Sequence, residues 1–491
     1  MRRRLLAMLV SIALVASAAP QAAGEAAPSY LQIDTLIKTE MRGAHIPGIS
    51  LGIVQDGQVT YLKGFGEASP GRPMLARTPM LLGSVSRWLT ATAVMQLVQA
   101  GKIDLDEKVT RYLPWFRLAD ENAAGLITIR HLLNQTSGLT TEAGMTPLLD
   151  DGLQTLEGTI YDLRQVLPAG PPGEQVRDSH LNYMILGLVV QAVSGQPFGT
   201  YLRSNIFAPL QMNRSFTTEA AAVKEFMAEG YQLWYGIPIP SPLTYPSNSV
   251  PSTSIISTAE DLTRFLAAQV NGGRYGTASA LSEQSVAYLR TAMGLSVVEI
   301  GGTTAFRQTG PMPSFHAELV LLPDRQAGFV LLANIQHPLI RLSMERLAVG
   351  ITAILAGQPA PSPGWLRQNL LVPYAVAVLA AAAVLVWSLE SLRRWRTRLQ
   401  SSGRMARWLA LGVVGLHLLV AVGLSFGVPW AVHGSWAQLQ LFAPDTGRLL
   451  AAAVLASFIG AGGRIIIAYI TLRKQGASWN DSQSSSHANT A

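Results

Sequence analysis

The chain has 491 residues, 49% of them hydrophobic and only 14% charged, where an ordinary soluble protein carries about 25% charged residues, so we expect part of it to lie in a membrane. The absence of cysteine excludes disulfides, thiolate metal sites and a cysteine nucleophile. The net charge of +7 comes from arginines gathered in two short segments, residues 2–4 and 393–407, and because of this clustering we expect no nucleic-acid partner.

The N-terminus has the pattern of a bacterial secretory signal peptide, which we predict over residues 1–23. Arginines at 2–4 precede an apolar run from Leu5 to Val15, and small residues at 16–18 or 21–23 offer cleavage sites. An uncleaved anchor helix is the alternative, although this run is shorter than the roughly 20 residues that a membrane span needs. In both cases we expect the following domain outside the cytoplasm.

Residues 29–355 are long enough for one large two-lobed domain with its own core. Two pairs of β-rich runs predict hairpins around polar turns: Ile49 to Val54 with Val59 to Leu62, and Glu318 to Leu322 with Gly328 to Ala333. Because one pair lies near each end of the region, we predict an antiparallel sheet built from both ends of the domain.

Helical patterns fill the middle of this domain. One predicted helix stops before Gly101 and rests on apolar residues at helical spacing: Trp88, Ala91, Met95 and Val98. The segment from Ser257 to Glu260 has the form of a capping box that opens another helix through Phe265. The predicted fold class is therefore α+β, an antiparallel sheet flanked by helices with an inserted helical lobe.

The C-terminal region has the composition of a membrane domain. Residues 356–368 are a predicted linker, in which alternate prolines favour extended backbone. Beyond it, residues 369–472 hold three predicted transmembrane helices: Leu370 to Leu389, Leu409 to Val432 and Leu449 to Leu472. Arg464 interrupts the third, so it must reach the bilayer surface, face a partner helix or mark the end of a shorter span.

The charges beside these spans predict their orientation. Six arginines separate the first two predicted spans, and the positive-inside rule assigns them to the cytoplasm. Residues 473–491 then form a cytoplasmic tail, which we predict to be disordered. We expect a multi-pass protein of the bacterial inner membrane, with the lipid bilayer as a partner and the large domain extracytoplasmic.

Between residues 30 and 350 lies a series of short motifs: Gly83-Ser84-Val85-Ser86-Arg87, Gln99-Ala100-Gly101, Thr136-Ser137-Gly138-Leu139, Pro172-Gly173, Asn182-Tyr183 and Gln308-Thr309-Gly310. Together they resemble the serine β-lactamase and penicillin-binding-protein superfamily, in particular its class C-like β-lactamase-related serine hydrolases. The resemblance implies a β-lactamase/transpeptidase-like fold, and the membrane region lies outside it.

The resemblance also implies a serine nucleophile that a lysine activates from one helical turn further on, in an S-x-x-K motif. Ser84 has the nucleophile position, and Arg87 stands where the lysine belongs. Their spacing puts both residues on one face of a helix. Because a guanidinium stays protonated, Arg87 can hold an anion but cannot accept a proton from Ser84.

The second family motif contains a tyrosine and follows Pro172-Gly173. By spacing it falls on Asp178-Ser179-His180, so Asp178 replaces the tyrosine. One interpretation pairs Asp178 with Arg87 across the pocket as a structural ion pair. The other makes Asp178 or His180 a replacement general base for Ser84, which requires hydrogen-bond reach.

The third family motif, Lys-Thr-Gly or His-Thr-Gly, appears as Gln308-Thr309-Gly310, and Gln308 brings no positive charge to a substrate. In the family, the amide after this glycine helps to form the oxyanion hole, but here the position is Pro311, which has no N–H. Loss of one such donor costs about a hundred- to a thousandfold in turnover. A one-residue bulge in the strand would present another amide.

These four departures lead to our main hypothesis, a membrane-anchored β-lactamase-related protein that is catalytically impaired and binds an acyl or peptide-like envelope ligand or a partner. The alternative is an active serine hydrolase, an esterase, peptidase or penicillin-interactive enzyme, that forms an acyl-enzyme at Ser84. A third hypothesis is a membrane module that senses or transduces. We expect no cofactor and no metal, because His131 and His316 lack ligand partners at recognisable spacing.

Overall fold

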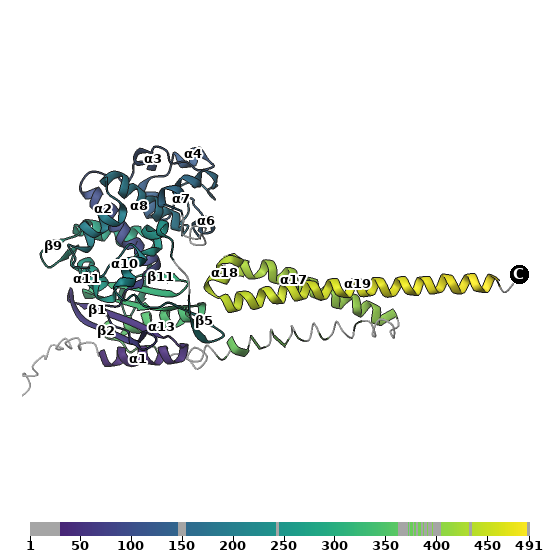
Figure 1. The fold of residues 1–491 in the computed structure, drawn as a ribbon. Helices are drawn as coiled ribbons and strands as arrows, with labels where there is room; N and C mark the ends of the chain where they lie inside the picture. Colours follow the sequence, from purple (N-terminus) through teal and green to yellow (C-terminus); the bar gives the residue numbers. More distant parts are fainter. Residues whose placement is uncertain are drawn as a thin grey trace, which may run out of the picture.

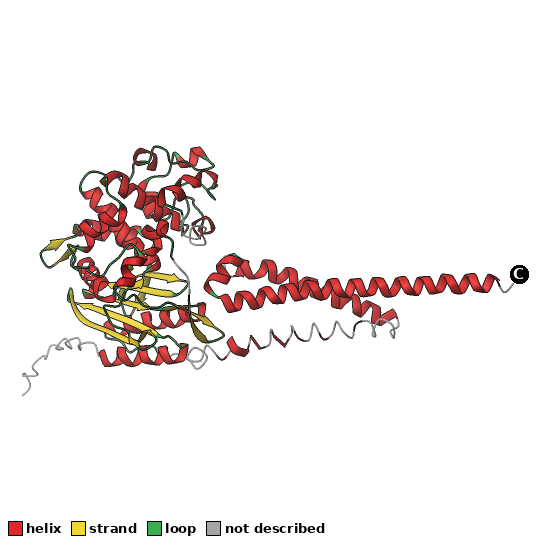
Figure 2. Ribbon diagram, viewed as in Figure 1, coloured by secondary structure: helices red, strands yellow, loops and turns green. Residues whose placement is uncertain are grey.

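The computed structural model describes residues 30–145, 154–241, 245–361, 404–431 and 435–488, together with some residues between 372 and 395. The predicted signal peptide, residues 362–368 of the predicted linker and most of the predicted first span lie outside the described residues. Figures 1 and 2 show a lobe built around a sheet, a helical lobe beside it, and C-terminal helices that extend away from both.

A seven-stranded sheet forms the first lobe, in the order β10-β11-β12-β13-β1-β2-β3, with every neighbouring pair antiparallel. Its strands are β1 (Gly48–Gln55), β2 (Gln58–Ser69), β3 (Arg72–Pro73), β10 (Ser296–Ile300), β11 (Thr303–Met312), β12 (Phe315–Leu322) and β13 (Ala327–Ala333). Ile49 of β1 lies opposite Ala333 of β13, so the two predicted hairpins are neighbours. The prediction of an antiparallel sheet built from both ends of the domain is confirmed.

Alternate side chains of the sheet pack into two separate cores, because successive residues of a strand point to opposite faces. Val320 and Leu322 of β12 belong to the core shared with α1 (Tyr30–Ala44) and α13 (Pro338–Leu355). Leu319 and Leu321 belong to the core shared with α11 (Ala259–Val270) and the helical lobe. The sheet is therefore covered on both faces (Figure 1).

The helical lobe is inserted between the strands, as predicted. Its helices are α2 (Ser86–Gln99), α3 (Val109–Tyr112), α4 (Glu121–Ala124), α5 (Ile129–Leu133), α6 (Thr141–Met145), α7 (Leu156–Asp162), α8 (His180–Ser194), α9 (Phe198–Leu202) and α10 (Glu219–Lys224). The predicted stop of α2 is confirmed, since Gly101 has a φ of 67° that glycine adopts without strain.

Shorter elements connect the two lobes. They are β4 (Met80–Leu81), β5 (Tyr231–Trp234), β6 (Ile237–Pro240), β7 (Ile256–Ser257), β8 (Arg274–Tyr275), β9 (Ala278–Ser279), α12 (Glu283–Ala292) and β14 (Ile335–Gln336). The pair β4 and β7 brings the segment before Ser84 to the segment before α11. The hairpin of β5 and β6 extends β14 into a small separate sheet.

The predicted capping box at Ser257 to Glu260 lies one residue further along in the structure. Thr258 is the N-cap of α11, and its hydroxyl accepts a hydrogen bond from the N–H of Asp261 at 3.0 Å. Asp261 does not return a hydrogen bond to the cap, because its carboxylate bonds to Arg214 and Ser215 outside the helix and to Arg264 within it. The start of the helix is therefore predicted correctly to within one residue. The prediction of a second, reciprocal hydrogen bond back to the N-cap is wrong.

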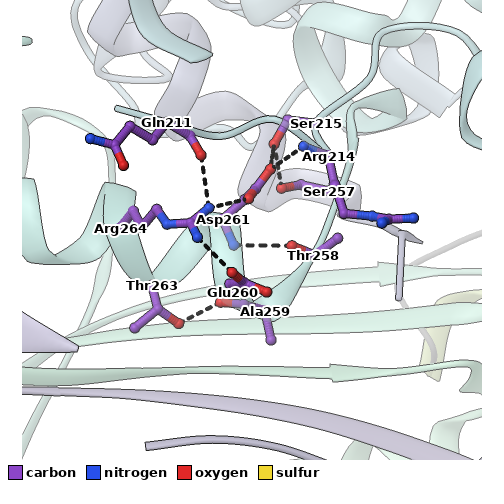
Figure 3. A network of polar contacts seen from close by, with 10 residues as sticks. All are labelled: Gln211, Arg214, Ser215, Ser257, Thr258, Ala259, Glu260, Asp261, Thr263 and Arg264. Atoms are coloured by element: carbon purple, nitrogen blue, oxygen red, sulfur yellow. Dashed lines mark hydrogen bonds and ion pairs between the residues drawn. The ribbon is translucent and has the colours of Figure 1, made fainter. Parts of the chain in front are cut away.

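The carboxylate of Asp261 joins α11 to the segment before α10 (Figure 3). It is 1% exposed, and it accepts hydrogen bonds from the N–H of Arg214 at 2.7 Å and the hydroxyl of Ser215 at 2.9 Å. Arg264, one turn along the helix, donates to the same carboxylate at 2.8 Å. This network holds a loop of the helical lobe against a helix that covers the sheet.

Two C-terminal helices are long and apolar enough to cross a membrane. They contain the segments Gly412–Trp430, in α17 (Arg404–Ala431), and Pro444–Ile470, in α19 (Pro444–Ala488). The short helix α18 (Trp436–Phe442) lies between them in sequence. The described residues thus give two candidate spans where we predicted three, because most of the first predicted span lies outside them.

Two structural features bear on the predictions for this region. Arg464 faces a neighbouring helical segment: it is fully buried, and its guanidinium lies 5.4 Å from the ring of Trp395. Helix α19 continues to Ala488, through most of the segment for which we predicted a disordered tail. No proline interrupts this stretch to end the helix.

We predict that Asp261→Ala lowers the free energy of unfolding by about 2–3 kcal/mol, because it removes charge-assisted hydrogen bonds and leaves the partly buried backbone N–H of Arg214 without its partner. Thermal or denaturant unfolding of the full chain measures this loss. Asp324→Ala is the matched control, since Asp324 is exposed in the turn between β12 and β13. Equal stability of the two variants would contradict a structural role for the network.

Candidate functional site

Ser84 lies in a turn of 3-10 helix, Gly83–Val85, directly before α2. This turn packs closely on β11, since a Cβ atom at Gly83 would lie 2.5 Å from the carbonyl oxygen of Gly310. A Cβ atom at Gly310 would in turn lie 2.0 Å from the carbonyl oxygen of Leu82. Only glycine fits at both positions, and their contact places Ser84 beside the third motif.

A cleft of about 640 Å³ opens beside Ser84, between the two lobes. All seven predicted site residues line it: Ser84, Arg87, Asp178, His180, Gln308, Thr309 and Pro311. Ser84 is 9% exposed, and its hydroxyl forms no hydrogen bond within the part of the chain that the structure describes. The three family motifs therefore meet at one place, with the serine hydroxyl unengaged.

Arg87 is the centre of the polar contacts in this cleft. It is 5% exposed, and its Nη1 donates to Oδ1 of Asp178 at 2.5 Å. Its Nη2 contacts Nδ1 of His180 at 2.9 Å. Because a guanidinium only donates, Nδ1 of His180 is the acceptor, and the proton of this neutral ring lies on Nε2. The predicted ion pair between Asp178 and Arg87 is present.

The charge of Arg87 changes the acidity of both partners. Burial lowers the pKa of His180, and the positive charge of Arg87 lowers it further, to about 3. Burial acts to raise the pKa of Asp178, but the charge and hydrogen bond of Arg87, together with His180, hold the pKa below its usual value. The Asp178 side chain is 68% exposed, which limits the effect of burial. At neutral pH, Asp178 is therefore ionised and His180 is neutral.

Gln135 also belongs to this site, although we did not predict it. It is 3% exposed, and its side-chain amide donates to Asp178 at 3.3 Å and accepts from the N–H of Ser179 at 3.1 Å. Its oxygen also accepts from the side chain of Asn182. Gln135 has a φ of 60°, which is unusual for a residue with a side chain. A glutamine beside the predicted Thr136 motif was the only signal in the sequence.

The third motif occupies the strand positions that the family spacing predicts, without a shift in register. β11 and β12 pair continuously from Phe306 opposite Leu321 to Met312 opposite Phe315, with Pro311 opposite His316. The alternative of a one-residue bulge is therefore wrong, and the position after Gly310 has no N–H to offer. Proline is tolerated here because β10 pairs with β11 only as far as Arg307.

A buried ionic network lies behind Gln308. Arg307 donates twice to the carboxylate of Glu318, at 2.7 and 2.8 Å, and Glu318 is fully buried. Nε2 of His316 contacts the same carboxylate at 2.7 Å, and Nδ1 of His316 contacts Gln336 at 2.9 Å. Burial acts to raise the pKa of Glu318, but hydrogen bonds from Arg307 and His316 keep it below the usual value. The network brings no proton acceptor to Ser84.

One wall of the cleft comes from the C-terminal region, which sequence reasoning missed entirely. Residues of α18 and the position after it line the cleft: Gln438, Leu439, Phe442 and Ala443. No sequence pattern relates this short helix between two apolar segments to a site more than 300 residues earlier. The short helix reaches the cleft only through tertiary contacts with the domain.

Comparison with known proteins places the chain in one family. The family model for Beta-lactamase matches residues 33–354. Protein flp of Staphylococcus aureus (strain COL) is 25% identical over 470 residues, which cover 90% of this chain and 91% of that protein. This match is longer than the region of the family model, so it extends into the C-terminal helices. Penicillin-binding protein 4 of Amycolatopsis lactamdurans is 32% identical over 234 residues, 47% of this chain and 61% of that protein.

Solved structures share the fold. The octameric penicillin-binding protein homologue from Pyrococcus abyssi superimposes with a TM-score of 0.59 at 23% identity, over 68% of this chain and 78% of that chain. The D-alanine carboxypeptidase AmpC from Burkholderia cenocepacia does so with a TM-score of 0.53 at 22% identity, over 65% of this chain and 97% of that chain. The family model, the motifs gathered in the cleft and this shared fold agree: the chain belongs to the β-lactamase family.

Proposed function

We propose that this protein is a membrane-tethered member of the β-lactamase family whose cleft binds an acyl or peptide-like ligand of the bacterial envelope and has lost most of its acyl-transfer chemistry. The observation that carries the proposal is the pair of contacts from Arg87 to Asp178 and His180. They occupy both groups that were candidates to replace the missing base.

Neither group is a competent base for Ser84. A general base works best when its pKa lies near the working pH, and the pKa values of both Asp178 and His180 lie far below neutrality. Nδ1 of His180 accepts from Arg87, and Nε2 already carries the ring proton. The interpretation of Asp178 as a structural partner of Arg87 is therefore favoured over its role as a base.

Stabilisation of the transition state is reduced as well. The backbone N–H of Ser84 remains, but Pro311 supplies no second donor at the adjoining strand. The loss of one oxyanion donor costs about a hundred- to a thousandfold, and the loss of the base adds to this cost. The close packing of Gly83 on Gly310 is nevertheless kept, which supports a binding role for an intact cleft.

The apolar C-terminal helices support the tether. Gly412–Trp430 and Pro444–Ile470 each have the length and composition of a span. Together with the predicted signal peptide, they favour an extracytoplasmic domain at the bacterial inner membrane. The cytoplasmic arginines between the predicted first and second spans would set this orientation.

The alternative, an active serine hydrolase, rests on one observation. Ser84 keeps the nucleophile position at the start of α2, lines the cleft and has a hydroxyl without a hydrogen bond in the described part of the chain. Such an enzyme requires a proton acceptor for Ser84 that arises only when substrate binds. Covalent labelling distinguishes the two functions.

We predict that the full chain shows no labelling of Ser84 by a fluorescent penicillin or a fluorophosphonate above the level of Ser84→Ala. The combined variant Arg87→Lys, Asp178→Tyr, Gln308→His and Pro311→Gly should gain labelling, because it restores the family's groups at all four positions. Adding Ser84→Ala to this variant is the control that must abolish the gain. A folded but inert combined variant would show that other defects exist, and rapid labelling of the unaltered chain would establish the hydrolase.

A pH prediction follows from the lowered pKa of His180. An unfolded histidine titrates near pH 6.5, so the unfolded chain binds more protons than the folded chain between pH 6.5 and about 3. Stability contributed by neutral His180 is complete above pH 6.5 and is lost as the pH falls, by at most about 1.4 kcal/mol per pH unit.

The comparison of the full chain with His180→Asn tests this dependence, since asparagine still offers Arg87 an acceptor but does not titrate. Between pH 6.5 and 4.5, the melting temperature of the unaltered chain should fall more steeply than that of the variant. Asp178 contributes only below about pH 4, outside this window. Parallel curves would contradict a neutral His180 held beside Arg87.

Binding itself is tested with a fluorescent N-acyl dipeptide as the probe. We predict reversible binding that Ser84→Ala retains, because no covalent step is involved. Ser296→Trp should abolish it by filling the cleft, which Ser296 lines from the start of β10. Ser279→Trp is the matched control at an exposed serine of β9, outside the cleft. If Ser296→Trp leaves binding unchanged, the probe does not use this cleft.

A further inference from the structure

The segment that joins the two candidate spans docks on the β-lactamase domain. We call residues 435–446, which hold α18 and the first turn of α19, the elbow. Figure 1 shows the tip of the α17 and α19 pair, with α18, beside the hairpin that contains β5. The side chain of Gln232 in β5 donates to the carbonyl oxygen of Leu441 at 2.9 Å.

A fully buried carboxylate holds the elbow in place. Asp445 accepts hydrogen bonds from the backbone N–H of Tyr235 at 2.7 Å and from the hydroxyl of Tyr374. Nε2 of His337 lies 3.3 Å from its other oxygen. Because Nδ1 of His337 accepts from the N–H of Leu339, Nε2 carries the proton and donates to Asp445.

This docking is specific, because a carboxylate in an apolar helix is costly unless polar groups surround it. The domain supplies two of the groups that satisfy Asp445, the N–H of Tyr235 and the ring of His337. The guanidinium of Arg448, one turn along α19, also lies 4.7 Å from the ring of Trp234. The elbow is therefore fixed to the domain by polar contacts of defined geometry.

The docked elbow gives the cleft two chemically different ends. Ser84, Arg87 and Gln308 form a polar end, and Leu439 and Phe442 of α18 form an apolar wall. A ligand that fills the cleft contacts both. A small polar peptide would leave the apolar wall without a partner, whereas an amphiphile would cover it.

The apolar wall belongs to the segment between the two candidate spans, and therefore lies near one surface of the bilayer. α18 connects Gly412–Trp430 to Pro444–Ile470, so it sits at one surface of a bilayer that both segments cross. The turn between β5 and β6, beside Asp445, exposes apolar side chains: Tyr235 is 48% exposed and Ile237 is 61% exposed. Exposed apolar and aromatic residues at this level are typical of contact with the lipid interface.

Two exposed arginines lie in the cleft or on the helix that follows the elbow. Arg341, in the second turn of α13, lines the cleft and is exposed, and Arg448 is exposed at the start of α19. Neither arginine forms an ion pair within the described residues, unlike Arg87 and Arg307. Their guanidinium groups match the phosphate of a lipid headgroup in charge and geometry.

We infer that the cleft takes a membrane-borne amphiphile with a phosphate headgroup of net negative charge, whose acyl chain passes along Leu439 and Phe442 into the bilayer. This inference rests on the proposed function, since it names the class of ligand for the same cleft. The ligand enters sideways from the membrane surface, and the elbow is the element that selects for a lipid chain.

The test uses the full chain in lipid nanodiscs that contain phosphatidylglycerol with a diazirine in its acyl chain. After irradiation, peptide mapping should find cross-links on α18 and on cleft residues of the domain, Met293 and Ser296, as well as on the spans. Cross-links on the spans serve as the control for insertion. Labelled spans with an unlabelled cleft would overturn the inference.

Matched variants assign the two ends of the ligand. Phe442→Ser should remove the cross-links on Met293 and Ser296, whereas Phe458→Ser, at a partly exposed position on α19 outside the cleft, should retain them. Arg341→Gln should reduce them about tenfold through loss of a charge-assisted hydrogen bond. Arg77→Gln, at an exposed arginine outside the cleft, should not. If the two phenylalanine variants had equal effects, the assignment of the acyl chain to the apolar wall would be wrong. If the two arginine variants had equal effects, the assignment of the phosphate to Arg341 would be wrong.

Two further control experiments identify the source of the phosphate. Comparison with the N-acyl dipeptide separates this inference from the proposed function. Excess soluble glycerol phosphate should not displace the lipid; displacement would make a soluble phosphate ester the ligand and overturn the inference. Equal labelling by the phosphatidylcholine analogue would contradict the inference that the cleft selects a headgroup of net negative charge. If the N-acyl dipeptide binds but no lipid reaches the cleft, only this inference fails, whereas the absence of both would refute the proposed function as well.

Discussion

The contact of Arg87 with Asp178 and His180 determines what the cleft can do. A permanent cation lies one helical turn from Ser84, and it lowers the pKa of the two side chains closest to replacing a base. The same contact joins α2 to the start of α8, so it also holds the helical lobe together around the cleft. In the proposed function, the position that holds a catalytic lysine in the family holds a structural arginine here.

The scaffold around Ser84 is kept while its chemistry is altered. Gly83 and Gly310 still permit the close packing that positions the serine beside β11, and the register of β11 and β12 has no bulge. Pro311 lies in the part of β11 that pairs with β12 but lies beyond the pairing with β10, which ends at Arg307, so the fold tolerates a residue without an N–H on that side of the strand. The proposed function therefore requires that the geometry of the cleft be kept while its catalytic groups change.

The parts of the fold that local pattern governs were predictable from the sequence. The hairpins around β1 and β13, the end of α2 at Gly101 and the meeting of the motifs at Ser84 depend on short-range signals or on family spacing. Gln135 and the elbow depend on tertiary contacts between residues far apart in the chain, which no periodicity reveals. The capping box predicted from Ser257 to Glu260 does not form, since Thr258 is the N-cap and the carboxylate of Asp261 bonds to Arg214 and Ser215.

The central claim is that Ser84 has no usable proton acceptor while Arg87 remains. The most direct measurement is the rate constant for acylation of Ser84 in the full chain by a fluorophosphonate, followed across the neutral pH range. Our account predicts a rate no greater than that of an isolated serine, without an inflection that reports a titrating base. A rate like that of active relatives, rising with the ionisation of one group, would contradict it.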